Sequence, residues 1–276
     1  MTNEGRFLRQ EALFGKEGQE KIGSTHVAIV GVGGIGTHEV QQLPLLGTQE
    51  FTLIEPQELD ETNKNRYVGH RHDDPIPGTA KLEIARRTIL AVNPEAVIHC
   101  VPFPIEAGEA EDALSKVDVV FGCLDHEAPR FHLNELAASL GKPLIDAATE
   151  IFPGEVIRYG GRVFVCWNRP GCLVCCNVLD MEEVNAQLGS EEERANRRRV
   201  YGIELDGGGS GPSVVSLNGT IASIAITEFM VAITGLRSPV RLTTYYGEQG
   251  RFTKSLDAPK PGCYTCQLAM RALEAS

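Results

Sequence analysis

The sequence predicts an α/β fold built on a mostly parallel sheet, and three observations support this prediction. A buried strand at 27–30 runs into a glycine-rich turn, GVGGIG at 31–36, and then into a helix. Further apolar strands alternate with helical segments, as they do in parallel sheets. Two Cys-x-x-Cys pairs lie far apart in the C-terminal half. Together they predict an α/β, Rossmann-like sheet with a zinc-stapled C-terminal half.

The remaining elements follow from periodicity and from turn residues. A segment of mixed apolar and charged residues at 3–22 predicts one or two short amphipathic helices ahead of the first strand. We expect strands at 51–56, 96–103, 117–123, 143–147 and 155–165, helices at 36–47, 81–92, 131–140 and 214–235, and a closing hairpin at 242–252. The polar stretch 57–77 predicts a long loop, and the charged, glycine-rich stretch 189–211 predicts a mobile one.

Composition excludes several classes of protein. The 276 residues are 42% hydrophobic and 23% charged, which is typical of a globular protein. With 37 acidic and 26 basic residues the net charge is -11, which disfavours nucleic acid or an anionic membrane as the main partner. The N-terminus lacks an apolar signal region, and we expect the apolar runs to be too short to span a bilayer. These features predict a cytoplasmic protein.

Eight cysteines in such a chain indicate metal ligands, core residues or reactive thiols rather than a disulfide framework. The pairs Cys172/Cys175 and Cys263/Cys266 have the spacing of a structural zinc site with four thiolates. Cys100, Cys123 and Cys166 lie in or beside apolar strands, and we expect them to be inert core residues. Cys176 adjoins a ligand and is interpreted as a spare thiol, with a reactive nucleophile as the alternative.

The glycine-rich turn predicts a nucleotide site. Gly31, Gly33, Gly34 and Gly36 lie where a backbone turns tightly, approaches a phosphate and packs against the sheet. The helix that follows presents its N-terminus to the phosphate. Glu55 ends the next strand, at the spacing from which a carboxylate accepts hydrogen bonds from ribose hydroxyls. At this point both NAD and ATP fit the pattern.

Polar residues farther along favour ATP. Asn63, Asn65 and Arg66 lie in ETNKNRYVG, Lys81 lies in PGTAKLEIA, and Asp125 directly follows a buried strand. Two cations and one carboxylate suit a triphosphate with Mg²⁺, whereas hydride transfer requires none of them. The alternative is that these residues are ordinary charges of a solvated loop.

At these motifs the chain resembles the ThiF/MoeB/HesA group of ubiquitin-activating-enzyme-like adenylyltransferases. The resemblance spans nearly the whole chain and rests on motifs in the family's order: RFLRQEALFGKEGQEKI, VAIVGVGGIG, NKNRY, GTAKLEIA, CLDHEAPRFHLNELA and both cysteine pairs. In that family, the C-terminal carboxylate of a small β-grasp protein or a peptide attacks the α-phosphate of ATP, giving an acyl-adenylate and pyrophosphate. The resemblance therefore implies such an ATP-dependent activity on a ubiquitin-like protein, a sulfur-carrier protein or a peptide.

The resemblance also implies roles for single residues. Glu55 matches the residue that holds the ribose, while Asn65, Arg66 and Lys81 match residues that contact the phosphates. Asp125 matches the family's Mg²⁺-linked aspartate. A further match is an arginine that reaches into the partner subunit's site, here Arg9, and this implies a homodimer.

Two departures from the family pattern are notable. The usual glutamine after the loop arginine is Tyr67, and the stretch GIELDGGGSGPSVVS lacks the cysteine on which thiol-transferring members rely. Two rival functions are an NAD(P)-dependent oxidoreductase and a non-catalytic scaffold subunit of a heterodimeric activating enzyme. The identity of the partner stays open among a ubiquitin-like protein, a sulfur carrier, a peptide precursor and a tRNA base.

The resemblance implies a single domain over 1–276. We expect an N-terminal helical arm at 1–23, a nucleotide-binding half at 24–150, and a zinc-containing half at 151–276 that binds the substrate and forms the dimer.

Overall fold

The computed structural model describes residues 5–152, 157–168, 170–189, 212–255 and 258–275. Its centre is an eight-stranded sheet with the strand order β3-β2-β1-β4-β5-β6-β7-β8. The first five strands in this order are parallel, and β5 to β8 pair antiparallel. The strands are β1 (His26–Val30), β2 (Glu50–Ile54), β3 (Val97–Val101), β4 (Val119–Gly122), β5 (Leu144–Phe152), β6 (Arg158–Cys166), β7 (Leu242–Tyr246) and β8 (Arg251–Lys254).

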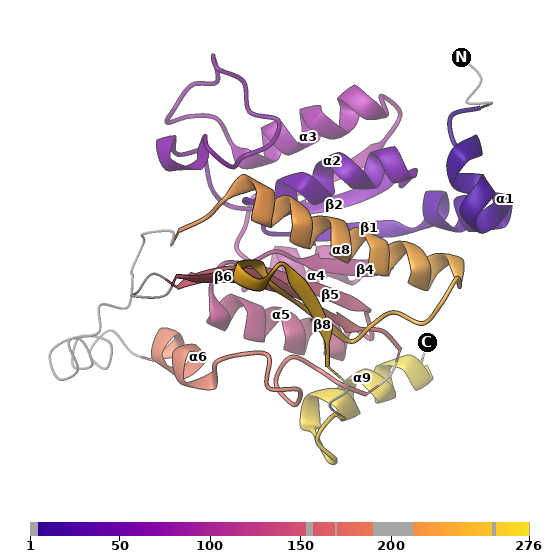
Figure 1. Cartoon of the computed structure of the whole chain (residues 1–276), viewed down its shortest axis with the longest axis vertical. Helices are drawn as coiled ribbons and strands as arrows, with labels where there is room; N and C mark the ends of the chain where they lie inside the picture. Colours follow the sequence, from indigo (N-terminus) through magenta and orange to yellow (C-terminus); the bar gives the residue numbers. More distant parts are fainter. Residues whose placement is uncertain (1–4, 153–156, 169, 190–211, 256–257, 276) are drawn as a thin grey trace, which may run out of the picture.

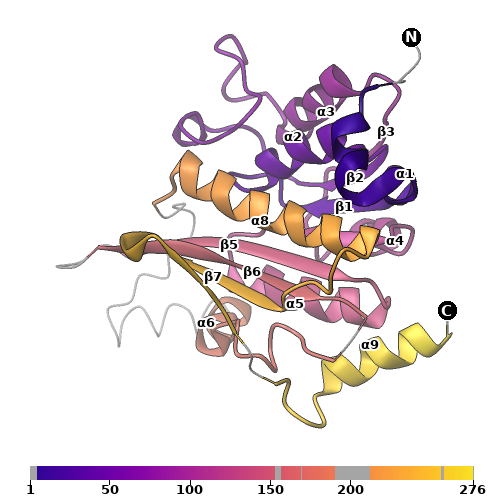
Figure 2. The same ribbon diagram turned by 45° about the vertical axis from the view of Figure 1, so that its right-hand side comes forward.

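Helices cover both faces of the sheet (Figures 1 and 2). One face packs against α1 (Leu8–Ser24), α2 (Gly36–Leu46), α3 (Lys81–Val92) and α8 (Val215–Thr234). The other packs against α4 (Gly108–Leu114), α5 (Glu127–Ser139) and α6 (Met181–Leu188), and α9 (Tyr264–Ala275) lies against α5. Short 3-10 helices occur at η1 (Glu61–Asn63) and η2 (Gly247–Gln249). This confirms the predicted α/β class with a mostly parallel sheet.

The strand order fixes where a ligand can bind. The chain leaves β1 toward β2 on one side and later returns to β4 on the other side. Such a reversal opens a crevice at the carboxyl ends of the parallel strands, where α/β proteins bind their ligands. The strands β1, β2 and β4 all end at this edge. The loops that follow them carry the glycine-rich turn, Glu55 and Asp125, so these residues are brought together.

The helix α8 agrees with the helix expected at 214–235. Its 20 residues would reach across a bilayer by length and composition, but half of the most apolar window is buried inside the protein. It packs against β5, β6, α1 and α2. Glu228 of α8 is buried and forms a two-point ion pair with Arg237 (2.6 and 2.8 Å). These contacts are those of a core helix.

Other expectations require correction. Cys100 is exposed, because β3 is an edge strand with only partial cover, so it is not a core residue. Cys123 is buried as predicted, and Cys166 is half-buried. The sequence analysis missed α4, α6 and α9, and β5 extends beyond its predicted end at residue 147. The predicted mobile loop lies, except for Gly189, outside the described residues.

A buried polar cluster lies beneath the end of β4. The Cys123 thiol donates a hydrogen bond to Glu39 Oε2 (2.9 Å), and Asp146 Oδ1 lies 3.4 Å from Arg130 Nε. Glu39 and Asp146 are fully buried. Burial raises the pKa of Glu39 to about 8, with the Cys123 hydrogen bond opposing the shift and the Asp146 charge adding to it. Glu39 is therefore a protonated carboxyl group near neutral pH.

This shift predicts a pH-dependent stability. Between the ordinary pKa of 4.5 and about 8, the folded protein holds a proton that the unfolded chain releases, so stability falls as pH rises. Glu39→Gln should remove this contribution. The difference between its urea unfolding midpoint and that of the wild type should shift in favour of the variant as the pH rises from about 5 to about 8. Exposed Glu106→Gln should track the wild type, and a Glu39→Gln curve parallel to the wild type would contradict the assignment.

Candidate functional site

The glycine-rich turn between β1 and α2 requires glycine at two positions. Gly31 has φ +87°, and a Cβ there would lie 2.8 Å from the carbonyl oxygen of Cys123. A Cβ on Gly36 would lie 2.2 Å from the carbonyl oxygen of Gly31. Gly33 differs, because no described heavy atom lies within 4 Å of its Cβ position. The turn is thus packed tightly against the sheet and open at Gly33, where a ligand can approach the backbone.

Glu55 joins this turn to the end of β2. Its Oε2 accepts a hydrogen bond from Val32 N (3.0 Å), and its Oε1 accepts one from Gln57 N (2.9 Å). The residue is only 6% exposed. Burial raises the pKa of Glu55 above its ordinary value, while the positive charge of Lys81 and the two backbone donors oppose the shift. Each carboxylate oxygen keeps a lone pair with which it can accept a ribose hydroxyl.

Lys81 and Asp125 complete one charged group with Glu55. Lys81 is the first residue of α3, is buried, and donates from Nζ to Gln57 Oε1 (2.6 Å). Asp125 follows β4, and its side chain is 74% exposed. Both charges act on the Glu55 carboxylate. Glu55 and Lys81 lie at the two ends of the connection between β2 and α3, and Asp125 lies in the loop after β4, so the structure brings three predicted site residues to the same edge of the sheet.

The predicted loop residues lie beside the turn, held by their own loop. Asn63 Oδ1 accepts from Asp60 N (3.1 Å) and caps η1. Arg66 NH1 donates to Asn65 Oδ1 (3.1 Å) and to a backbone carbonyl of the same loop. Arg66 Cδ lies 3.6 Å from the Cβ position of Gly34, so the arginine borders the turn. These contacts hold the guanidinium group next to the turn.

Tyr67, the departure from the family pattern, is a structural residue. It is buried against Leu59 and Ile84, and its hydroxyl donates to the backbone carbonyl of Lys81 (3.1 Å). Burial raises the pKa of Tyr67 well above its ordinary value. The side chain therefore ties the loop after β2 to the start of α3 and helps to position Lys81.

Arg9 does not join the site of its own chain. It is exposed on α1, whose residues Gln10 and Gln19 donate to backbone carbonyls of Leu45 and Leu46 at the end of α2 (both 2.9 Å). The turn lies at the opposite end of α2, about 16 Å away for its length. A role for Arg9 therefore requires a second subunit.

The sequence analysis missed one residue that borders the turn. Asn218 of α8 is buried, and its Nδ2 lies 2.4 Å from the Cβ position of Gly34. Its Oδ1 accepts from Thr149 Oγ1 (2.9 Å), and its Nδ2 donates to Ser213 Oγ (3.1 Å). The available signal was an amide on the buried side of an apolar helix, a placement that requires a polar partner.

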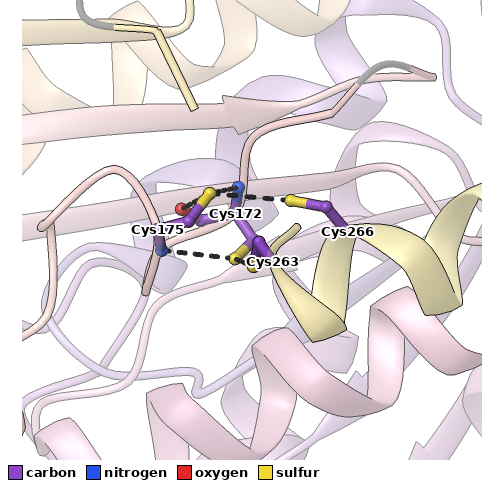
Figure 3. A group of neighbouring side chains, drawn as sticks. All are labelled: Cys172, Cys175, Cys263 and Cys266. Atoms are coloured by element: carbon purple, nitrogen blue, oxygen red, sulfur yellow. Dashed lines mark hydrogen bonds between the residues drawn. The ribbon is translucent and has the colours of Figure 1, made fainter. Parts of the chain in front are cut away.

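The four predicted zinc ligands converge (Figure 3). Cys172 and Cys175 come from the loop after β6, and Cys263 and Cys266 come from the start of α9. Cys172 Sγ lies 3.6 Å from Cys263 Sγ, Cys175 Sγ lies 3.6 Å from Cys266 Sγ, and all four sulfur atoms lie within 4.8 Å of one another. Four thiolates around a tetrahedral Zn²⁺ are separated by about 3.8 Å, so the cluster is consistent with a zinc site.

Backbone donors surround these sulfur atoms. Gly171 N donates to Cys266 Sγ (3.2 Å), and Cys172 N donates to Cys175 Sγ (3.3 Å). Such donors stabilise thiolate charge, as a metal site requires. The neighbouring Cys166 thiol donates to the carbonyl oxygen of Gly171 (2.8 Å), so this cysteine supports the loop. Cys176 is half-buried beside the cluster.

Comparison with known proteins agrees with this geometry. A family model described as the ThiF family matches residues 7–266. The chain belongs to the ThiF family. Among curated relatives, the adenylyltransferase and sulfurtransferase MOCS3 of Drosophila yakuba is 28% identical over 274 residues, covering 96% of this chain and 54% of the relative. MOCS3 of Drosophila willistoni is 33% identical over 168 residues, covering 59% of this chain and 36% of the relative. This ThiF-family chain thus spans 54% of the first relative and 36% of the second.

Solved structures share the fold. Escherichia coli MccB with AMPCPP and MccA superposes with a TM-score of 0.74 at 19% identity, covering 96% of this chain and 75% of that one. The structure of PaaA superposes with a TM-score of 0.65 at 20% identity, covering 92% of this chain and 84% of that one. The fold shared with these structures therefore extends over nearly all of the chain.

The cysteine cluster predicts a metal-dependent stability. Purified, dialysed protein should retain about one Zn²⁺ held by the four thiolates. Cys263→Ser should lose this ion and melt at a lower temperature, because the loop after β6 and the start of α9 lose their link. Exposed Cys100→Ser is the matched control and should keep both zinc and melting temperature. Elemental analysis that finds no zinc in the wild type, or identical melting of the two variants, would contradict this interpretation.

Proposed function

We propose that this protein is an ATP-dependent adenylyltransferase that activates the C-terminal carboxylate of a ubiquitin-like protein, a sulfur-carrier protein or a peptide. The products are an acyl-adenylate and pyrophosphate. The observation that carries the proposal is the convergence of the open glycine turn, Glu55, Lys81 and Asp125 at the crevice of the sheet. Membership of the ThiF family and the name of the MOCS3 relatives support the same activity.

In this proposal the triphosphate lies along the turn and the N-terminus of α2, where the helix dipole favours negative charge. Glu55 accepts the ribose hydroxyls. Lys81, Arg66 and Asn65 contact the phosphates, and Asn63 shapes the loop that carries them. Asp125, exposed at the end of β4, would hold Mg²⁺, which neutralises phosphate charge when bound.

The reaction has one main barrier, the approach of an anionic carboxylate to a polyanion. The cations Lys81 and Arg66 lower this repulsion and orient the α-phosphate for in-line attack. The carboxylate oxygen forms a bond to the α-phosphorus as the bond to the β-phosphate bridging oxygen breaks, and pyrophosphate leaves. A general base is unnecessary, because a C-terminal carboxylate is already ionised at neutral pH.

The partner is proposed as a class. The MccB structures include one with the peptide MccA, and MOCS3 carries a sulfurtransferase name as well. This chain spans about half of MOCS3, so we propose the adenylation step alone. We further propose a cytoplasmic homodimer in which Arg9 completes the partner's site, with residues 151–276 supplying the substrate and dimer surfaces.

Two rival functions explain fewer of the observed contacts. An NAD(P)-dependent oxidoreductase leaves the buried Lys81 and the exposed Asp125 without a role. A non-catalytic scaffold has no need of a charged group assembled from the connection between β2 and α3 and the loop after β4. The alternative role of Cys176 as a thioester nucleophile is not proposed, because the thiol is half-buried beside the zinc ligands.

Pyrophosphate exchange into ATP tests the activity directly. With Mg²⁺ and a carboxylate-terminated partner, such as a sulfur-carrier protein or a short peptide, the wild type should catalyse exchange. Asp125→Ala should lower the rate on the order of 100-fold, because preorganised charge is the largest catalytic contribution in such sites. Exposed Asp112→Ala on α4 should keep the wild-type rate. Exchange that survives Asp125→Ala would overturn the assignment of this residue.

A further inference from the structure

A second group of metal-ligand side chains lies at the amino edge of the sheet, away from the crevice and the cysteines. His26 begins β1, Glu50 begins β2, and His99 lies in the middle of β3. In the parallel register His26 is opposite Glu50, and Thr52 is opposite His99. Residues two apart on a strand share a face, so all these side chains project from the same side of three adjacent strands.

The ligand atoms are spaced as a metal ion requires. Glu50 Oε1 lies 3.5 Å from His26 Nδ1 and 3.2 Å from His99 Nε2, and all three atoms lie within 4.8 Å of one another. Ligands bound at the usual Zn–N and Zn–O distances in a tetrahedron are separated by about 3.3 Å. Two of the three separations therefore match a shared ion without rebuilding the strands.

A second layer of contacts orients the most buried ligand. His26 Nε2 lies 2.9 Å from Thr52 Oγ1. With the ring proton on Nε2 donated to that hydroxyl, Nδ1 presents its lone pair toward Glu50. This is the arrangement in which metal-binding histidines are held, with the second ring nitrogen fixed by a hydrogen bond.

The local charge suits a cation. Asp118 accepts a hydrogen bond from the backbone of His26 (2.8 Å), so a second carboxylate lies next to His26. The side chains of His99 and Glu50 are about half exposed (52% and 45%), whereas that of His26 is 11% exposed. One ligand is thus fixed in the core, and the other two are open to an ion arriving from solvent.

We propose that His26, Glu50 and His99 form a Zn²⁺ site with two imidazole ligands and one carboxylate ligand. The fourth position faces solvent and is available to water or to a side chain of another molecule. The site lies one strand length, about 16 Å, from the glycine turn, so it is separate from the nucleotide crevice. Binding ties the amino ends of β1 and β2 to β3, which is the edge strand of the sheet.

Zn²⁺ alone is the probe for this site. Protein of residues 1–276 that already holds its thiolate-bound zinc is titrated with Zn²⁺ by calorimetry, and with Co²⁺ by visible absorption. We expect one further ion per chain, with Co²⁺ bands that lack thiolate charge-transfer absorption. His99→Ala and Glu50→Gln should each weaken this binding roughly tenfold or more. Both positions are half exposed, so neither variant should unfold the protein.

His72→Ala is the matched control, since His72 is exposed and lies outside the group. It should bind the further Zn²⁺ like the wild type. Zn²⁺ should also raise the melting temperature of the wild type and of His72→Ala, but not that of His99→Ala, because an ion bound only to the folded state stabilises it. Absence of further binding in the wild type, equal binding in His99→Ala, or a loss in His72→Ala as large as in His99→Ala would each overturn the proposal.

Discussion

The candidate active site depends on the hydrogen bonds and the charge interaction of the buried Glu55 carboxylate. Removing a carboxylate from water is costly unless hydrogen bonds and a counter-charge offset the loss. Here two backbone N–H groups, from Val32 and Gln57, and the charge of Lys81 supply that compensation. The same contacts fix the turn after β1, the end of β2 and the start of α3 relative to one another. These contacts within the chain thus hold the crevice in shape.

Residues of the C-terminal half also support this crevice. α8 places Asn218 against the turn at Gly34, and Asn218 is held in turn by Thr149 of β5. The cysteine cluster joins the loop after β6 to α9, which packs on α5. Since α5 begins two residues after Asp125, the cysteine cluster helps to hold the part of the crevice that we propose binds Mg²⁺.

Much of the fold could be predicted, because its signals are local. The strand and turn at 27–36 and the Cys-x-x-Cys pairs each reflect a short-range requirement. Other features depend on tertiary context. The exposure of Cys100 follows from the edge position of β3, which an apolar strand pattern does not reveal. Asn218 borders the turn only because α8 crosses it. His26, Glu50 and His99 are brought together by the register of the strands, so their spacing in the sequence does not indicate that they form a group.

The central claim is that ATP lies against the glycine turn above Glu55 and Lys81, and Gly33→Ala tests it most directly. A methyl group at Gly33 or at Gly108 meets no described atom within 4 Å, so both alanine variants should fold and melt like the wild type. Calorimetric titration with ATP should show binding weakened roughly tenfold or more in Gly33→Ala, where the methyl group meets the phosphates, and unchanged in Gly108→Ala. A folded Gly33→Ala protein that binds ATP as tightly as the wild type would contradict the account.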